Sequence, residues 1–253
     1  MNEFSFSASE SKAFDLNIYR SKISEMDLDF FKSKFLEDSV DVVVSRIDTQ
    51  LQNKLFPLFQ IIPHSYLADT LVYYSCILDQ KVKSELPPGL RIEIAGEEKR
   101  GELESLILRI FKGYQNHYHS NPLFKQVDLA KGYLEWNLPF LIEKDKICLI
   151  IYDNEVPCAF LTAKIVENES FADIILNGAL KEYEGQGKYS FLIRALKNIL
   201  IERNILKLIV STQLTNQRVQ RVWTKENFGL EQSFYTFHHF ISPNSLQKLN
   251  SKF

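Results

Sequence analysis

The stretch that decides the fold is Ile174-Ile175-Leu176-Asn177-Gly178-Ala179-Leu180-Lys181-Glu182-Tyr183-Glu184-Gly185-Gln186-Gly187-Lys188-Tyr189. Its apolar start is typical of a strand, and the residues after it predict a helix from about 189 to 202. Two glycines one residue apart allow the backbone between strand and helix to turn its N–H groups toward an anion. The helix macrodipole adds partial positive charge at the same place. The stretch therefore predicts a site that fits a pyrophosphate.

The two glycines do not by themselves define a pyrophosphate site, because a Gly-x-Gly turn also occurs where a chain only needs positive φ. A dinucleotide-binding fingerprint would need a third glycine where Ser190 stands, and an acidic residue at the end of the next strand, where Thr212 and Gln213 stand. A P-loop would need Gly-Lys-Ser/Thr after four intervening residues, which this loop lacks. Two interpretations of the loop remain, a simple turn and a pyrophosphate site. The order of the predicted helices and strands distinguishes between them.

The predicted helices and strands around the loop follow one another in a defined order. After a predicted strand at 90–95 come two helices, three strands that form an antiparallel meander, the helix at 189–202, a strand, a helix and a last strand. The ranges after the first strand are 97–114, 128–143, 147–152, 158–166, 171–176, 189–202, 206–212, 217–225 and 233–241. This order, βααβββαβαβ, predicts an α/β fold with a mixed central sheet flanked by helices.

A domain boundary is predicted near residue 88, because Glu85-Leu86-Pro87-Pro88-Gly89 stops regular structure. Residues 1–88 then form a smaller N-terminal α/β domain, and residues 89–253 carry the loop. Apolar runs at 40–44 and 71–77 predict strands in the smaller domain, and 27–37 and 48–56 predict helices. It has no glycine before Gly89, which argues against a phosphate-binding loop there.

Composition excludes several functions. Thirty basic and 32 acidic side chains give a net charge of −2, so nucleic acid and membrane are not expected partners. The three cysteines are odd in number and far apart, and two lie in apolar runs, which predicts free thiols and a reducing compartment. The sequence has no secretory start and no apolar run of roughly 18 to 20 residues, so a cytoplasmic protein is expected.

The loop and a later helix resemble a known family. Residues 184–189 resemble the Gln/Arg-x-x-Gly-x-Gly/Ala signature of the GNAT acetyltransferases, which binds the pyrophosphate of acetyl-CoA, and residues 216–228 resemble the family's Asn-x-x-Ala-x-x-x-Tyr-x-x-x-Gly-Phe helix. The resemblance covers about 90–241, and the predicted order of elements is also that of the family. It implies an acetyl-CoA dependent N-acetyltransferase in which an amine attacks the thioester directly in a ternary complex. The sequence departs from the family at three positions: Glu184 and Tyr189 in the signature, and Trp223 in place of the frequent general-acid tyrosine.

A finer resemblance concerns the acceptor. Residues 211–216 and 220–223 are similar to the dTDP-fucosamine acetyltransferases, which also carry a smaller α/β domain. The similarity implies a nucleotide-linked, dTDP-type amino-deoxy sugar as the small-molecule acceptor, in surface polysaccharide (lipopolysaccharide O-antigen) synthesis. An amino acid, a polyamine or a protein amine is the alternative acceptor. A non-catalytic module that binds an acyl-CoA or a nucleotide is the further alternative, suggested by Trp223. By resemblance alone, a homodimer through the last strand is also expected.

The candidate site residues follow from these motifs. The resemblance implies cofactor binding by Ala179, Leu180, Gly185, Gln186, Gly187, Lys188, Tyr189 and Asn216. The candidate catalytic residues are His238, which titrates near neutral pH and lies in the last strand, His119 and Tyr183. The candidate substrate-binding residues are His117, Asn177, Trp223 and Tyr235.

The same side chains can also have purely structural roles. Each histidine can be a surface or hydrogen-bonded structural residue, and the helical spacing of Trp223 from Val219 and Val222 also fits core packing. No Asp, Glu or Cys accompanies His117 and His119 in their loop, so no metal site is expected there.

Overall fold

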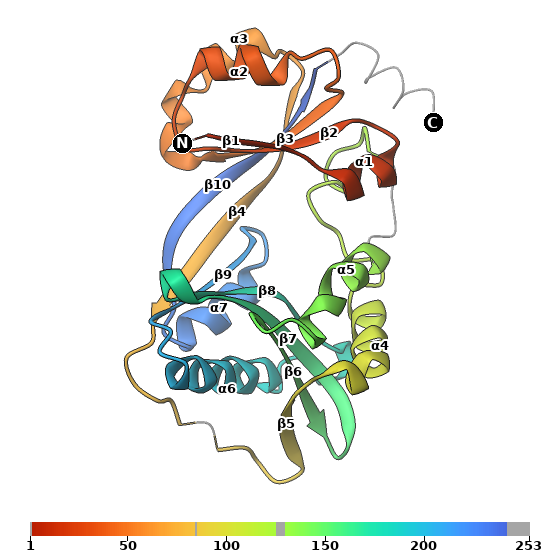
Figure 1. Cartoon of the computed structure of the whole chain (residues 1–253), viewed down its shortest axis with the longest axis vertical. Coiled ribbons are helices and arrows are strands. Elements are labelled where there is room, and N and C mark those ends of the chain that lie inside the picture. The colour runs from red at the N-terminus through yellow and green to blue at the C-terminus, as the bar shows by residue number, and fades with distance from the viewer. Residues whose placement is uncertain (1, 84, 125–129, 242–253) are drawn as a thin grey trace. The chain divides into compact units, whose positions relative to one another are not determined.

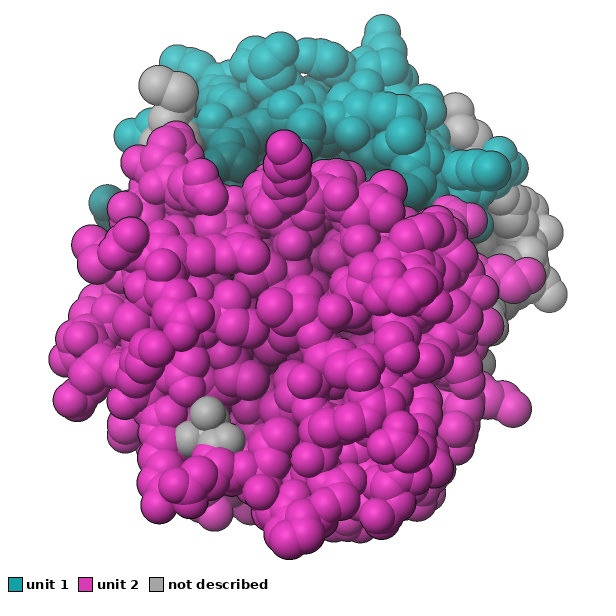
Figure 2. All heavy atoms as spheres, turned by 60° about the horizontal axis from the view of Figure 1, so that its bottom comes forward, with its two compact units in different colours: residues 1–72, 115–127, 232–253 teal, residues 73–114, 128–231 magenta. Residues whose placement is uncertain are grey.

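The computed structural model describes residues 2–83, 85–124 and 130–241 (Figure 1). The chain forms two compact units (Figure 2), of which unit 1 comprises residues 1–72, 115–127 and 232–253, and unit 2 residues 73–114 and 128–231. This division does not coincide with the predicted boundary near residue 88. Two later segments of the chain belong to unit 1, one of which contributes a strand to its sheet.

Unit 1 contains a mixed sheet in the order β1-β2-β3-β10-β4. Its strands are β1 (Glu3–Phe6), β2 (Ile18–Ile23), β3 (Val42–Asp48), and parts of β4 (Ser65–Ile77) and β10 (Gly229–Phe240), and its helices are α1 (Ala8–Phe14), α2 (Leu28–Phe35), the 3-10 helix η1 (Thr49–Lys54) and α3 (Phe56–Ile61). β2 pairs with β3 in parallel, and residues 234–240 of β10 pair with β3 in antiparallel fashion. The buried rings of Phe31 and Phe35 on α2 pack with Val43 and Ile47 of β3. Asp27 caps α2 by accepting hydrogen bonds from two backbone N–H groups of its first turn.

Unit 2 contains a sheet in the order β4-β9-β8-β7-β6-β5. Its further strands are β5 (Leu90–Ile94), β6 (Lys146–Asp153), β7 (Val156–Val166), β8 (Phe171–Ala179) and β9 (Lys207–Gln213), and its α-helices are α4 (Arg100–Ile110), α5 (Ala130–Asn137), α6 (Lys188–Glu202) and α7 (Gln217–Lys225). Its short 3-10 helices are η2 (Glu97–Lys99), η3 (Leu138–Leu141), η4 (Glu167–Glu169) and η5 (Lys181–Tyr183). From β5 to β10 the elements follow the predicted order, which confirms the predicted α/β fold.

The helices of unit 2 cover both faces of its sheet (Figure 1). Alternate residues of β6 belong to two different apolar cores: Leu149 packs in the core that contains Leu192 and Leu196 of α6, whereas Ile150 packs in the core that contains Ile107 of α4. Because successive side chains of a strand point to opposite faces, α6 lies on one face of the sheet and α4 on the other. The sheet is thus enclosed on both sides.

All three cysteines are buried and free. Burial raises the pKa of the Cys148 thiol to about 12 and that of Cys158 to about 11, and it also raises the pKa of Cys76. The prediction of free thiols is confirmed. In the described part of the chain, no helix has the length and apolar character needed to cross a membrane.

Candidate active site

The predicted pyrophosphate loop connects β8 to α6 in unit 2. Gly185 and Gly187 have φ of +77° and +78°, in the left-handed region that other residues rarely adopt. This backbone conformation explains why both positions are glycine. Gly187 is the N-cap of α6, a helix of 15 residues, and as a glycine it has no side chain that could accept a hydrogen bond from the first N–H groups. The first N–H groups of a helix have no intrahelical partner. The loop, exposed from Glu184 to Gly187, therefore offers these groups to an anion.

Next to the loop, β8 separates from its neighbour β9, which leaves one edge of β8 without a paired strand among the described residues. β8 and β9 pair in parallel from Phe171 with Lys207 to Ile174 with Val210. Beyond that point β8 continues to Ala179 and β9 to Gln213 without further pairing between these two described strands. The opposite edge of β8 stays paired with β7 as far as Ala179 with Ala159. The backbone of β8 from about Ile175 onward is thus open toward β9, as an extended ligand with amide groups requires.

A β-bulge marks the point where the two strands separate. Thr162 of β7 pairs with Leu176, and the next residue, Ala163, pairs with Ile174, so that Ile175 has no opposite residue. The side chains confirm the bulge, because Ile174 packs in the α6 core while both Ile175 and Leu176 pack in the α4 core. A bulge bends a strand and increases its twist. It therefore accounts for the separation of β8 from β9.

Side chains of the loop have protein partners and leave the backbone to face a ligand. The Lys188 ammonium is buried, with Nζ 2.7 Å from Oδ2 of Asp153, so its side chain turns away from the loop surface. Gln186 donates from Nε2 to the carbonyl oxygen of Glu182 at 2.9 Å. Glu184 forms an ion pair with Arg218 of α7. The ion pair offsets the negative charge that Glu184 would place beside a phosphate.

Two of the three residues that depart from the family's motifs, Tyr189 and Trp223, contact each other. Trp223 donates from Nε1 to the hydroxyl oxygen of Tyr189 at 2.9 Å. Trp223 is 0% exposed in the α6 core, and its ring centroid lies 5.4 Å from that of Tyr74. Burial raises the pKa of Tyr189. The prediction that Trp223 binds substrate is wrong, because a fully buried indole whose N–H has a protein partner has no surface for stacking.

The predicted general base, His238, is a buried residue of unit 1. It is 0% exposed, its Nε2 lies 2.8 Å from Nδ1 of His117, and its Nδ1 accepts from Nδ2 of Asn121 at 2.9 Å. The ring of Tyr118 stacks on it at 5.1 Å. Burial lowers the pKa of His238 to about 3. Because both ring nitrogens have partners and the ring is closed off from solvent, the structure gives His238 a structural role in place of the predicted catalytic one.

The remaining candidates divide between the units. In unit 1, Asn116 donates its backbone N–H to Nδ1 of His119 at 3.2 Å, and Tyr235 donates its hydroxyl to Oε1 of Gln52 at 3.0 Å. Unit 2 holds Asn177 and Ala179 of β8, Leu180 after it, Tyr183 of η5, the loop, and Asn216, which donates from Nδ2 to Oγ1 of Thr212 at 3.1 Å. Among the described residues, no three His, Cys, Asp or Glu side chains gather in a way that could hold a metal ion.

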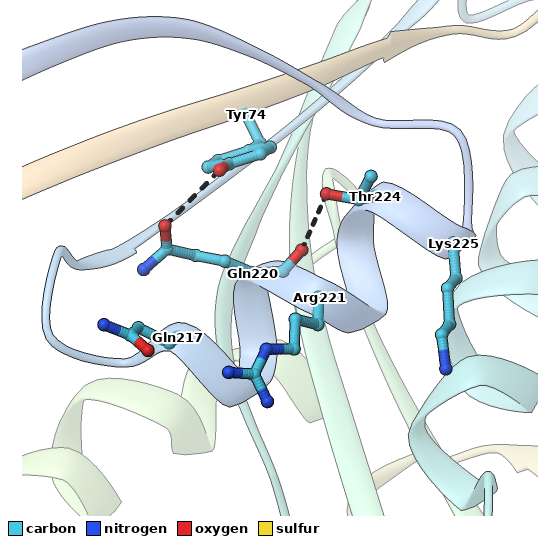
Figure 3. A pocket seen from close by; sticks show the side chains of 6 residues that line it. All are labelled: Tyr74, Gln217, Gln220, Arg221, Thr224 and Lys225. Carbon is cyan, nitrogen blue, oxygen red and sulfur yellow. Dashed lines mark hydrogen bonds between the residues drawn. The ribbon is translucent and has the colours of Figure 1, made fainter.

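Sequence reasoning missed a groove on the exposed face of α7 (Figure 3). It has a volume of about 510 Å³ and is lined by Tyr74, Gln217, Gln220, Arg221, Thr224 and Lys225. Tyr74 donates its hydroxyl to Oε1 of Gln220 at 3.3 Å, and Thr224 donates to the carbonyl oxygen of Gln220 at 3.0 Å. The groove is open, and the residues of the Gly185 loop do not line it. Sequence reasoning also did not single out Thr162, a buried polar residue of β7. The one sign of it in the sequence is a hydroxyl side chain within a largely apolar strand.

Acid should destabilise unit 1 through His238 and His239. Burial lowers the pKa of each to about 3, against an unfolded value near 6.5. Above pH 6.5 both states are neutral, and between pH 6.5 and 3 only the unfolded state binds the protons. As the pH is lowered through that window, the free energy of unfolding is therefore expected to decrease. The decrease is at most about 1.4 kcal/mol per pH unit for each histidine. Urea unfolding at pH 7.5, 6.5 and 5.5 measures this slope.

His239→Gln provides the comparison for this prediction. His239 has a ring nitrogen 2.7 Å from the hydroxyl of Ser45 and the other 2.7 Å from that of Ser65, and a glutamine amide can make similar contacts without titrating. The variant should show a shallower slope below pH 6.5. An equal slope in the variant and the natural protein would contradict the assignment to His239.

The fold and the loop together are typical of enzymes that transfer an acyl group from a coenzyme A thioester. Residues 107–229 match the model of the acetyltransferase (GNAT) family. This region is therefore similar to the GNAT acetyltransferases, a family that binds acetyl-CoA.

Solved structures share the fold at low sequence identity. A GCN5-related N-acetyltransferase from Sphaerobacter thermophilus is 11% identical with a TM-score of 0.67, over 96% of this chain and 77% of that chain. A GCN5-related N-acetyltransferase from Kribbella flavida is 10% identical with a TM-score of 0.58, over 89% of this chain and 82% of that chain. A search of curated protein sequences found no match.

Proposed function

We propose that unit 2 holds acetyl-CoA along the Gly185 loop and the open edge of β8, and transfers its acetyl group to a small-molecule amine. The observation that carries this proposal is the combination of a helix N-terminus at Gly187 without a side-chain cap and a β8 edge that no longer pairs with β9 after Ile174. The α6 N–H groups would bind the pyrophosphate, and the β8 backbone would bind the amides of the pantetheine arm. When bound, acetyl-CoA supplies the activated acyl group.

The chain's own residues orient the reactants in this proposal. Backbone N–H groups at the end of β8 would donate a hydrogen bond to the thioester oxygen, which would stabilise the negative charge that develops as the amine attacks. Of the three predicted catalytic side chains, only Tyr183 belongs to the unit that carries the loop. We keep its phenol as the candidate acid for the leaving thiolate, and Asn177 and Asn216 as candidate ligand-binding residues.

The proposed acceptor is a nucleotide-linked, dTDP-type amino-deoxy sugar used in surface polysaccharide synthesis. Support comes from the similarity of residues 211–216 and 220–223 to enzymes that act on such sugars. The burial of Trp223 removes one residue of that similarity from the surface, so its support rests on 211–216 and 220–222. Amino acids, polyamines and protein amines are the competing acceptors.

Heat denaturation with and without excess acetyl-CoA tests the cofactor site. A ligand that binds only the native state raises the midpoint by mass action. We expect a clear rise with acetyl-CoA and a smaller one with acetyl-pantetheine, which lacks the pyrophosphate. An unchanged midpoint at millimolar acetyl-CoA would overturn the assignment of the loop.

A panel of amines with acetyl-CoA then tests the acceptor. The panel contains a dTDP-linked amino sugar, the free amino sugar, amino acids, a polyamine and a peptide. Turnover that requires the dTDP-linked sugar is the expected result. Equal turnover of the free amino sugar, or preference for another amine, would contradict the proposed acceptor while leaving acetyl transfer in place.

A further inference from the structure

A buried polar contact lies directly behind the open edge of β8. Thr162 of β7 and Asn137 at the end of α5 are both 0% exposed, and the Thr162 hydroxyl donates to Oδ1 of Asn137 at 2.7 Å. Asn137 in turn donates from Nδ2 to the carbonyl oxygen of Tyr133 at 2.8 Å. Polar groups are costly to bury, and a fully hydrogen-bonded arrangement of this kind fixes the positions of its members.

The same hydroxyl binds the backbone of the bulge. Leu176 donates its N–H to Oγ1 of Thr162 at 3.2 Å, and that oxygen also lies 3.1 Å from the carbonyl oxygen of Leu176. Leu176 follows Ile175, the residue that the bulge leaves without an opposite partner. A bulge disrupts the hydrogen-bond ladder locally, so its backbone groups need other partners. Thr162 supplies that partner from a side chain.

Removal of the hydroxyl would leave a backbone N–H in the apolar α4 core without its partner. A valine has nearly the same shape as threonine but cannot accept this hydrogen bond. The bulge would then shift until the Leu176 N–H found another acceptor, which would change the direction of the strand after Ile174 and its separation from β9.

We propose that Thr162 and Asn137 are positioning residues that hold the β8 bulge in the shape that admits the pantetheine arm of acetyl-CoA. This inference rests on the proposed cofactor site. It assigns a binding role to two side chains that lie behind the strand and touch no ligand themselves. Their effect should therefore fall on the pantetheine half of the cofactor and spare its nucleotide half, which faces the α6 loop.

Calorimetric titration of three variants tests the proposal. Thr162→Val is expected to weaken acetyl-CoA binding about tenfold, as loss of a buried hydrogen bond implies, and Thr162→Ser, which keeps the hydroxyl, should stay within about twofold. Thr236→Val removes a buried hydroxyl from β10 in unit 1 and serves as the matched control, with unchanged affinity. The nucleotide half of coenzyme A, titrated alone, should bind Thr162→Val and the natural protein equally.

Hydrogen exchange separates failure of this inference from failure of the cofactor site. In the absence of any ligand, the Leu176 amide should exchange faster in Thr162→Val than in Thr162→Ser. If the natural protein does not bind acetyl-CoA, the cofactor site is wrong. If it does bind, and Thr162→Val matches it in affinity, the inference is overturned; an equal loss of affinity for the nucleotide half would also overturn it.

Asn137→Ser provides a second variant in case Thr162→Val does not fold. It shortens the side chain that accepts from Thr162 and leaves the hydroxyl itself in place. We expect a loss of acetyl-CoA affinity in the same direction but smaller than tenfold. Unchanged affinity together with unchanged exchange of the Leu176 amide would overturn the proposal.

Discussion

Gly187→Val is expected to weaken acetyl-CoA binding by about 1 to 3 kcal/mol, which is roughly 5- to 150-fold. Gly187 has φ of +78°, and a β-branched residue adopts this conformation only under strain. A Cβ at this position would meet its first neighbour, Phe191, at an ordinary 3.9 Å, so backbone strain outweighs crowding within the protein. Relief of the strain would rotate the first N–H groups of α6 away from the phosphate. Isothermal titration with acetyl-CoA measures the loss.

Gly229→Val is the matched control for this variant. Gly229 begins β10, has no positive φ, and has open space where a Cβ would stand, so valine fits a strand position there. The control should bind acetyl-CoA like the natural protein. A folded Gly187→Val with unchanged affinity would show that the pyrophosphate binds elsewhere.

Trp223→Ala is expected to lower the free energy of unfolding by about 3 to 5 kcal/mol, because it opens a large cavity in a close-packed core. The indole packs among Leu192, Leu196 and other apolar side chains of the α6 core. It also supplies the hydrogen bond to Tyr189, whose oxygen would lose a partner. Urea unfolding, followed by circular dichroism, measures the change.

Tyr189→Phe separates the hydrogen bond from the packing in the same cluster. It removes only the hydroxyl and should cost about 1 kcal/mol. If Trp223→Ala instead kept its stability and raised the KM of the amine, the indole would have to be a substrate platform, contrary to its burial.

The fold of unit 2 was predictable because its signals are local. Apolar spacing along α4, α6 and the strands from β6 to β8 identified each element without knowledge of distant residues. The glycines were interpretable for the same reason, since positive φ at Gly185 and Gly187 depends on the immediate backbone. The order of elements then led to the fold.

What could not be predicted depends on contacts between distant parts of the chain. The boundary near residue 88 ignored the pairing of residues 234–240 with 42–48, which places the last strand in unit 1. The position of His238 in the last strand gave no sign of which residues cover its side chain, namely His117 and Asn121. The bulge at Ile175 could not be predicted from the sequence. Ile174, Ile175 and Leu176 are all apolar, so the change in the face to which successive side chains point does not alter the apolar pattern.

The buried cysteines affect how the reaction is measured. Acetyl transfer from acetyl-CoA releases coenzyme A with a free thiol, and disulfide reagents that react with thiolates detect it. Cys76, Cys148 and Cys158 are closed off from solvent, and their raised pKa values keep them as thiols near neutral pH. The native enzyme should therefore give almost no fast signal of its own, and thiol appearance can report turnover continuously with each amine. A slow background signal would instead report unfolding, so one reagent follows both catalysis and the integrity of the fold.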